Sequence, residues 1–319
     1  RPTTLIQSLL GSSESATTEV DEIQYVDLHP NGRWVMVTTE SGKVRVFHRD
    51  SREELACATE LRARVARFRA DGQAILLGNR GSLHIVPCHD DGESLSVEVG
   101  ERRALLDEFK AAPGCGECAW SDDGQRIIFN STSGQAILLT LSGEVIKKVV
   151  VPTAGRLNRV AIDSLGRWAA AGPFQGVETR VYAVADGELL ASFETWRALV
   201  DFSPCGRWLG INGNAEILIV DTQDWKVRHR IDKPETHWGP LAFDPTGQLL
   251  FATLSERDLA VIDVQSGQRV GSINSPEAGR IKSLLYSHEH NVLLVGRDHV
   301  EAWDMRRIRD TLAAMGLDW

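Results

Sequence analysis

Two cysteines spaced two residues apart are the first side chains in this chain whose pattern could support chemistry. Cys115 and Cys118 could share a zinc ion or form a disulfide. A tetrahedral zinc site needs a second pair of ligands, and no other pair in the chain has matching spacing. Cys118 falls at a repeat position, described below, that is apolar elsewhere: Val26, Ala66, Val160, Val200 and Leu241. We therefore expect Cys118 to pack in the core, and we expect no metal and no cofactor.

Other catalytic motifs are missing from the sequence. His288 and His290 flank Glu289 on an expected turn, where the helical geometry of a zinc-binding His-Glu motif does not apply. The chain has no Gly-rich phosphate loop ending in Lys and Ser or Thr, and no Gly-x-Ser-x-Gly nucleophile elbow. Functional side chains must therefore be sought through the elements that position them.

Composition and charge narrow the class of protein. The chain has 319 residues, of which 42% are hydrophobic and 25% charged, as is typical of folded globular proteins. Its formal charge of -9 disfavours nucleic-acid binding through phosphate contacts. No apolar run approaches the roughly 20 residues that span a bilayer. The five cysteines are irregularly spaced, which favours a reducing compartment. We expect a cytoplasmic protein without nucleic-acid or membrane partners.

A turn that ends in glycine recurs along the chain, with apolar residues on both sides. Its copies end at Gly32, Gly72, Gly124, Gly166, Gly206 and Gly247, and a degenerate seventh copy ends at His290. Successive copies lie 40, 52, 42, 40, 41 and 43 residues apart. Apolar runs joined by Asp-Gly and Ser-Gly turns are typical of β-hairpins, because glycine adopts the positive φ that these turns need. Four short strands in about 41 residues predict one propeller blade per repeat.

The seven repeats predict an all-β chain that folds as a single seven-bladed β-propeller with four antiparallel strands per blade. The seventh repeat lacks a fourth strand after Trp303-Asp304, whereas the N-terminus carries a spare apolar strand. We expect residues 4–10 to complete blade seven and close the ring of a propeller domain spanning residues 1–305, because closure removes exposed strand edges. Apolar residues at helical spacing predict a short helix in the tail, residues 306–319.

The one long interval, between Gly72 and Gly124, places about ten extra residues between blades two and three. Residues 101–110 are rich in amino acids that favour helices. We predict a helical excursion here, which is either a surface insertion or an element that binds a partner.

Two turns extend into a longer motif, Leu199-Val200-Asp201-Phe202-Ser203-Pro204-Cys205-Gly206 and Leu241-Ala242-Phe243-Asp244-Pro245-Thr246-Gly247. The chain also contains one Trp-Asp pair, Trp303-Asp304. These motifs resemble those of the WD40-repeat family, in which an apolar strand enters a Ser-Pro-Asp-Gly turn and a Trp-Asp pair ends a later strand. No Gly-His pair occurs, so over about residues 20–305 the chain resembles a divergent member of the family.

The resemblance has implications for source and role. The ending Gly316-Leu317-Asp318-Trp319 is similar to the end of WD40 regions at the C-terminus of large bacterial proteins, some of which carry a Ser/Thr kinase domain. The resemblance therefore implies a bacterial WD-repeat scaffold that binds other proteins, and it allows that the chain is the C-terminal regulatory domain of a longer polypeptide.

Propeller enzymes usually place metal-binding carboxylates or a histidine near the central channel, so the expected channel lining tests for catalysis. The residues eight positions before each turn end are Gln24, Arg64, Gly116, Asn158, Ala198, Gly239 and Lys282. None of them is a carboxylate, although Glu22 and Glu117 lie at neighbouring positions. We therefore expect a protein that is not an enzyme. The alternative is a metal-dependent propeller hydrolase or lactonase.

The loops between the blades carry basic and aromatic residues. Arg and Trp are enriched at the energetic centres of interfaces, because they combine a large contact area with directional donors. The predicted partner-binding residues are Arg62, Arg64, Arg156, Arg159, Trp196, Arg197, His237, Trp238, Arg280 and Lys282. We predict that a monomeric propeller binds a protein or acidic peptide on this face.

Overall fold

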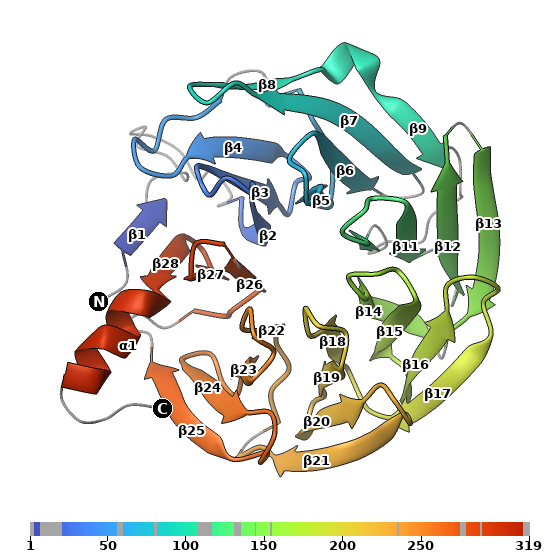
Figure 1. The fold of residues 1–319 in the computed structure, drawn as a ribbon, viewed down its shortest axis with the longest axis vertical. Coiled ribbons are helices and arrows are strands. Elements are labelled where there is room, and N and C mark those ends of the chain that lie inside the picture. The colour runs from blue at the N-terminus through green and yellow to red at the C-terminus, as the bar shows by residue number, and fades with distance from the viewer. Residues whose placement is uncertain are drawn as a thin grey trace.

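The chain forms seven antiparallel β-sheets, which are arranged as blades around a central axis (Figure 1). A computed structural model describes residues 3–6, 21–55, 60–79, 82–106, 117–130, 135–143, 145–153, 155–234, 236–274, 279–287 and 289–314. The all-β, seven-bladed propeller expected from the repeat is confirmed.

Blades three to six each contain four strands in chain order. Blade three consists of β10 (Cys118–Trp120), β11 (Arg126–Asn130), β12 (Gln135–Ser142) and β13 (Val145–Pro152). Blade four consists of β14 (Arg156–Ile162), β15 (Trp168–Gln175), β16 (Glu178–Ala183) and β17 (Leu189–Glu194). Blade five consists of β18 (Leu199–Phe202), β19 (Trp208–Asn212), β20 (Glu216–Asp221) and β21 (Lys226–Asp232). Blade six consists of β22 (Leu241–Phe243), β23 (Leu249–Thr253), β24 (Asp258–Asp263) and β25 (Arg269–Asn274).

Blade seven closes the ring with a strand from the other end of the chain. It contains β26 (Ser283–Ser287), β27 (Val292–Gly296), β28 (Val300–Asp304) and the N-terminal β1 (Thr3–Ile6). β1 is antiparallel to β28, with Thr3 opposite Ala302 and Ile6 opposite Val300. The expected closure is confirmed, although the strand begins at Thr3; residues 7–10 of the expected strand lie outside the described residues. In blade one the described strands are β2 (Ile23–Leu28), β3 (Trp34–Thr39) and β4 (Val44–His48).

In blade two, part of the predicted helical excursion is a β-strand instead. Its first three strands are β5 (Val65–Phe68), β6 (Ala74–Asn79) and β7 (Ser82–Asp90). Two short strands, β8 (Leu95–Val97) and β9 (Arg103–Leu106), both pair with β7, and a 3-10 turn, Val99–Glu101, lies between them. Residues 103–106 are therefore strand rather than helix, while residues 107–116 lie outside the described part of the chain. Leu105 and Leu106 are buried against blade three, and this burial outweighs a weak helix propensity.

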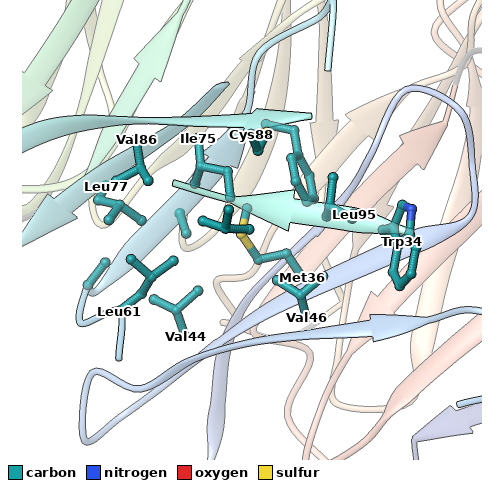
Figure 2. Close-up of a cluster of buried hydrophobic side chains, with 14 residues drawn as sticks. Trp34, Met36, Val44, Val46, Leu61, Ile75, Leu77, Val86, Cys88 and Leu95 are labelled. Carbon is teal, nitrogen blue, oxygen red and sulfur yellow. The ribbon is translucent and has the colours of Figure 1, made fainter. Parts of the chain in front are cut away.

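The core consists of apolar clusters between neighbouring blades. Figure 2 shows the cluster between blades one and two, where Trp34 and Met36 of β3 pack with Ile75 and Leu77 of β6. Cys118 is fully buried in the equivalent cluster with Phe129, which confirms it as a core residue. Each buried side chain stabilises the fold by about 1.5–3 kcal/mol, so packing between blades holds the ring together.

The repeat turns have the geometry that their glycines predict. Gly206 and Gly247 have φ of 68° and 69°, and their N–H groups donate to the carbonyl oxygens of Ser203 and Asp244. This left-handed conformation disfavours residues with a Cβ.

The expected C-terminal helix is α1 (Met305–Ala314). Met305 is fully buried in the cluster between blades six and seven, and Ile308 packs against the same cluster. No helix within the described residues is long and apolar enough to cross a membrane.

Candidate functional site

The central channel is lined by alternate residues of the innermost strands, because side chains on a strand point to opposite faces in turn. Residues five positions before each turn end line it: Asp27, Arg67, Ala119, Ala161, Asp201, Ala242 and Leu285. Residues seven positions before the turn also contribute: Tyr25, Val65, Glu117, Arg159, Leu199 and Pro240.

These positions correct the expected channel lining. The position eight residues before the turn falls near the start of the innermost strand and reaches only the mouth cavity, through Gln24, Arg64, Gly239 and Lys282. The expectation that no carboxylate lines the channel is therefore wrong, since Asp27, Glu117 and Asp201 all lie there. Counting five and seven residues back from each turn end would have found them.

The channel contains two cavities that share part of their lining. The mouth cavity, of about 360 Å³, is lined mainly by residues at or before the start of the innermost strands. The turn-side cavity, of about 390 Å³, lies next to the repeat turns. Both are lined by Tyr25, Arg159 and Leu199, and we call these three residues the waist.

Five of the ten predicted partner-binding residues come together at the mouth cavity. They are Arg64, Arg159, Trp238, Arg280 and Lys282, which come from blades two, four, six and seven. Only the closed ring brings them together, because residues 64 and 282 are far apart in the chain. Phe174 of β15 also lines this cavity, and sequence reasoning did not identify it.

A stack of cations and rings runs along the mouth cavity. The Arg280 guanidinium lies 3.9 Å from the ring centroid of Trp238. Trp238 meets Phe174 edge to face, with ring centroids 5.8 Å apart, and the Arg197 guanidinium lies 5.4 Å from the Phe174 ring. Such contacts hold long side chains in place without neutralising their charge.

Several arginines and one lysine give the mouth cavity positive charge. Only some of them lie close to an acidic side chain. Lys282 pairs with Glu22, and Arg159 lies 3.9 Å from Glu117. Within the described residues, Arg64, Arg197 and Arg280 have no ion pair of this kind. Burial lowers the pKa of Arg280, the negative charge of Glu256 opposes this shift, and the nearby positive charge of Arg197 adds to it. An anion entering the mouth would therefore relieve repulsion between cations.

Trp196 and Arg197 are neighbours in sequence but point to different sites. Arg197 has a φ of 50°, an uncommon conformation for a residue with a side chain. Trp196 is 56% exposed and lines a separate groove between blades four and five, together with Val177 and Arg230. Trp196 therefore lies outside the mouth cavity, although it is next to Arg197 in the chain.

Two further predicted residues, Arg62 and His237, are not among the residues that line the mouth cavity. Arg62 is exposed, and its Nη1 donates to the carbonyl oxygen of Leu61. The His237 N–H donates to the carbonyl oxygen of Asn214, and the His237 carbonyl accepts from Lys233 Nζ. Arg156 begins β14 opposite Gln175, and the position of its side chain lies outside what the structure describes.

The waist and the turn-side cavity hold an ionisable cluster, of which only Arg159 was among the predicted site residues. The Arg67 and Arg159 guanidiniums lie 4.4 and 4.7 Å from the ring centroid of Tyr25. Arg67 Nη2 also donates to the Tyr25 hydroxyl. Burial raises the pKa of Glu117, which faces both arginines.

The two aspartates in the turn-side cavity have raised pKa values. Burial raises the pKa of Asp27 to about 7, although its carboxylate accepts a 2.6 Å hydrogen bond from the Phe68 N–H. Burial raises the pKa of Asp201 to about 6, against the opposing effect of Arg67 and Arg159. Both carboxyl groups can therefore exchange protons near neutral pH.

The described residues do not assemble a metal centre. No group of three or more His, Cys, Asp or Glu residues in this part of the chain could hold a metal ion. Burial raises the pKa of the Cys118 thiol, which disfavours the thiolate that binds zinc. Cys115 lies outside the described residues.

Comparison with known proteins does not assign the chain to a family. No protein-family model matches the chain, and no curated protein sequence matches it. The fold and the channel define a seven-bladed β-propeller, an arrangement that is consistent with a WD40-like fold.

Proposed function

We propose that this protein is a non-catalytic interaction module that binds an acidic segment of a protein partner at the mouth of the propeller. The observation that carries the proposal is the mouth cavity itself, where Arg64, Arg280 and Trp238 from three blades surround a space of about 360 Å³. An acidic side chain fits these cations, and a peptide backbone can lie across the exposed faces of the rings.

We also propose that the chain is a divergent WD40 domain of bacterial origin that acts in the cytoplasm as a scaffold. It would then regulate a longer polypeptide such as a Ser/Thr kinase from the C-terminal end. The support is the seven-bladed fold together with the turn motifs at residues 199–206 and 241–247.

Affinity capture with matched variants tests the binding proposal. The baits are the wild-type chain, a Trp238→Ala/Arg280→Ala variant and a Lys226→Ala control, whose side chain is exposed on an outer strand. Mass spectrometry then identifies the retained proteins. We expect at least one partner that the wild type and the control retain and the double variant loses. Identical sets on all three baits would contradict the proposed site.

The enzymatic alternative, a metal-dependent hydrolase or lactonase, makes a different prediction. It requires a divalent metal bound in the channel in stoichiometric amount. Elemental analysis of the purified protein separates the two proposals, since the interaction module needs no metal for its fold or for binding.

A further inference from the structure

The turn-side cavity has a mixed lining. The charged residues Arg67, Arg159, Asp27 and Asp201 line it. It is also lined by small apolar residues at the same repeat position in blades three, four and six: Ala119, Ala161 and Ala242. Larger side chains at these positions would fill the space, so the alanines are the reason that a cavity of about 390 Å³ exists. Its size lies in the usual range for sites that bind small molecules.

The two arginines in this cavity are incompletely partnered. Arg67 Nε is buried and has no hydrogen-bond partner. Arg159 is only 8% exposed, and its close acidic partner, Glu117, lies 3.9 Å away. Burial lowers the pKa of Arg67 and the charge of Arg159 lowers it further, while Glu117 and Asp201 oppose this shift. Buried donors of this kind are usually satisfied, and an anion in the cavity could accept hydrogen bonds from these guanidiniums.

We propose that the turn-side cavity binds a small aliphatic carboxylic acid. Its carboxylate contacts Arg67 and Arg159, and its short hydrocarbon body packs against the three alanines. The site shares the waist residue Arg159 with the mouth cavity, but Arg67 and the three alanines line only the turn-side cavity, so the proposal does not depend on protein binding at the mouth.

The charged groups around the site predict how binding depends on pH. The ionisable residues around the two arginines are Asp27, Asp122, Asp201, Glu117, Cys118, Tyr25 and Tyr286, with Arg64 beyond the waist. As the pH rises through about 6 and about 7, Asp201 and then Asp27 ionise and add negative charge beside the guanidiniums. A ligand carboxylate with an ordinary pKa stays ionised over this range. Its affinity therefore falls as the pH rises.

Titration of the whole chain with hexanoate, followed by calorimetry, tests the proposal, with hexanamide as the neutral ligand of matched shape. We expect saturable binding of hexanoate at about pH 5.5 and an affinity at least about threefold lower at about pH 8. Hexanamide is expected to bind at least about tenfold more weakly than hexanoate, because it lacks the charge.

Two variants locate the site. Arg67→Gln removes one guanidinium, and Ala119→Leu fills space beside the alanines that line the cavity. Each change is expected to weaken hexanoate binding about tenfold or more. Arg269→Gln, at an exposed arginine on the outer strand β25, is the matched control and should bind as the wild type does. Circular dichroism confirms that each variant is folded, and the comparison of hexanoate with hexanamide needs no variant. The proposal is overturned if the wild type does not bind hexanoate, if it binds hexanamide equally well, or if folded Ala119→Leu binds hexanoate normally.

Discussion

At the turn-side end of the channel the lining side chains stand on strands, whereas at the mouth most of them stand just before a strand begins. Asp27 and Asp201 occupy β2 and β18, so the backbone ladders fix their directions. Trp238 and Arg280 precede β22 and β26, and ring stacking holds them in place. The difference indicates that the turn-side residues contribute to stability, while the mouth residues can change with little effect on folding.

Loss of ring closure would affect both ends of the channel, and we expect it to lower the free energy of unfolding more than any other change. Deletion of residues 1–10 removes β1 and leaves one edge of β28 unpaired along residues 300–302, while the other edge stays paired with β27. Several hydrogen bonds of about 1 kcal/mol each are lost, so the free energy of unfolding should fall by about 3–5 kcal/mol. Chemical denaturation measures the change. An unchanged free energy of unfolding and solubility would show that the ring does not depend on β1.

Removal of a turn-side carboxyl group is expected to cost stability. Asp27→Ala leaves the buried Phe68 N–H without its acceptor and should lower the free energy of unfolding by about 1–3 kcal/mol. Asp27→Asn keeps a carbonyl acceptor and serves as the control. Denaturation at about pH 6 compares the two variants, because a neutral carboxyl then dominates in the wild type. Equal stabilities of the Ala and Asn variants would contradict a stabilising role for this contact.

Truncation at the mouth is expected to weaken binding while sparing the fold. Trp238→Ala removes the ring between Arg280 and Phe174 and should weaken binding of a captured partner by about 2 kcal/mol. The free energy of unfolding should change by less, because Trp238 is only partly buried. Titration calorimetry and denaturation of the same variant separate the two effects. Unchanged affinity would remove the basis for placing the partner at the mouth.

The smallest expected effect is the contribution of the turn-side residue Asp201 to the pH dependence of stability. The pKa of Asp201 is raised to about 6 in the folded protein, so the folded state binds its proton more tightly than the unfolded state does. This contribution to stability is present at low pH and is lost as the pH rises from about 4 through about 6. Relative to Asp201→Asn, the wild type should lose about 1 kcal/mol or more over that interval. Parallel stability curves for the two proteins would contradict a raised pKa.

The repeat predicted most of the fold but less of the site. The turn spacing predicted seven blades, and the missing fourth strand after Trp303 predicted closure by the N-terminus. The helix expected at residues 101–110 was wrong over residues 103–106, because burial of Leu105 and Leu106 beside β7 outweighs local propensity. Of the site, Arg64 and Trp238 were predicted, whereas Phe174 was not, because it lies at the end of a second strand, outside the repeat positions that were compared.

The sequence alone determined the number of blades, their strand order and the apolar positions, because hydrophobic period and turn chemistry are local properties. Only the tertiary structure decided which charges meet. Arg67 and Arg159 come from blades two and four, yet both contact Tyr25 of blade one across the channel. Their contact depends on ring closure and on the phase of each innermost strand, and a shift of one residue along a strand would turn these side chains away from the channel.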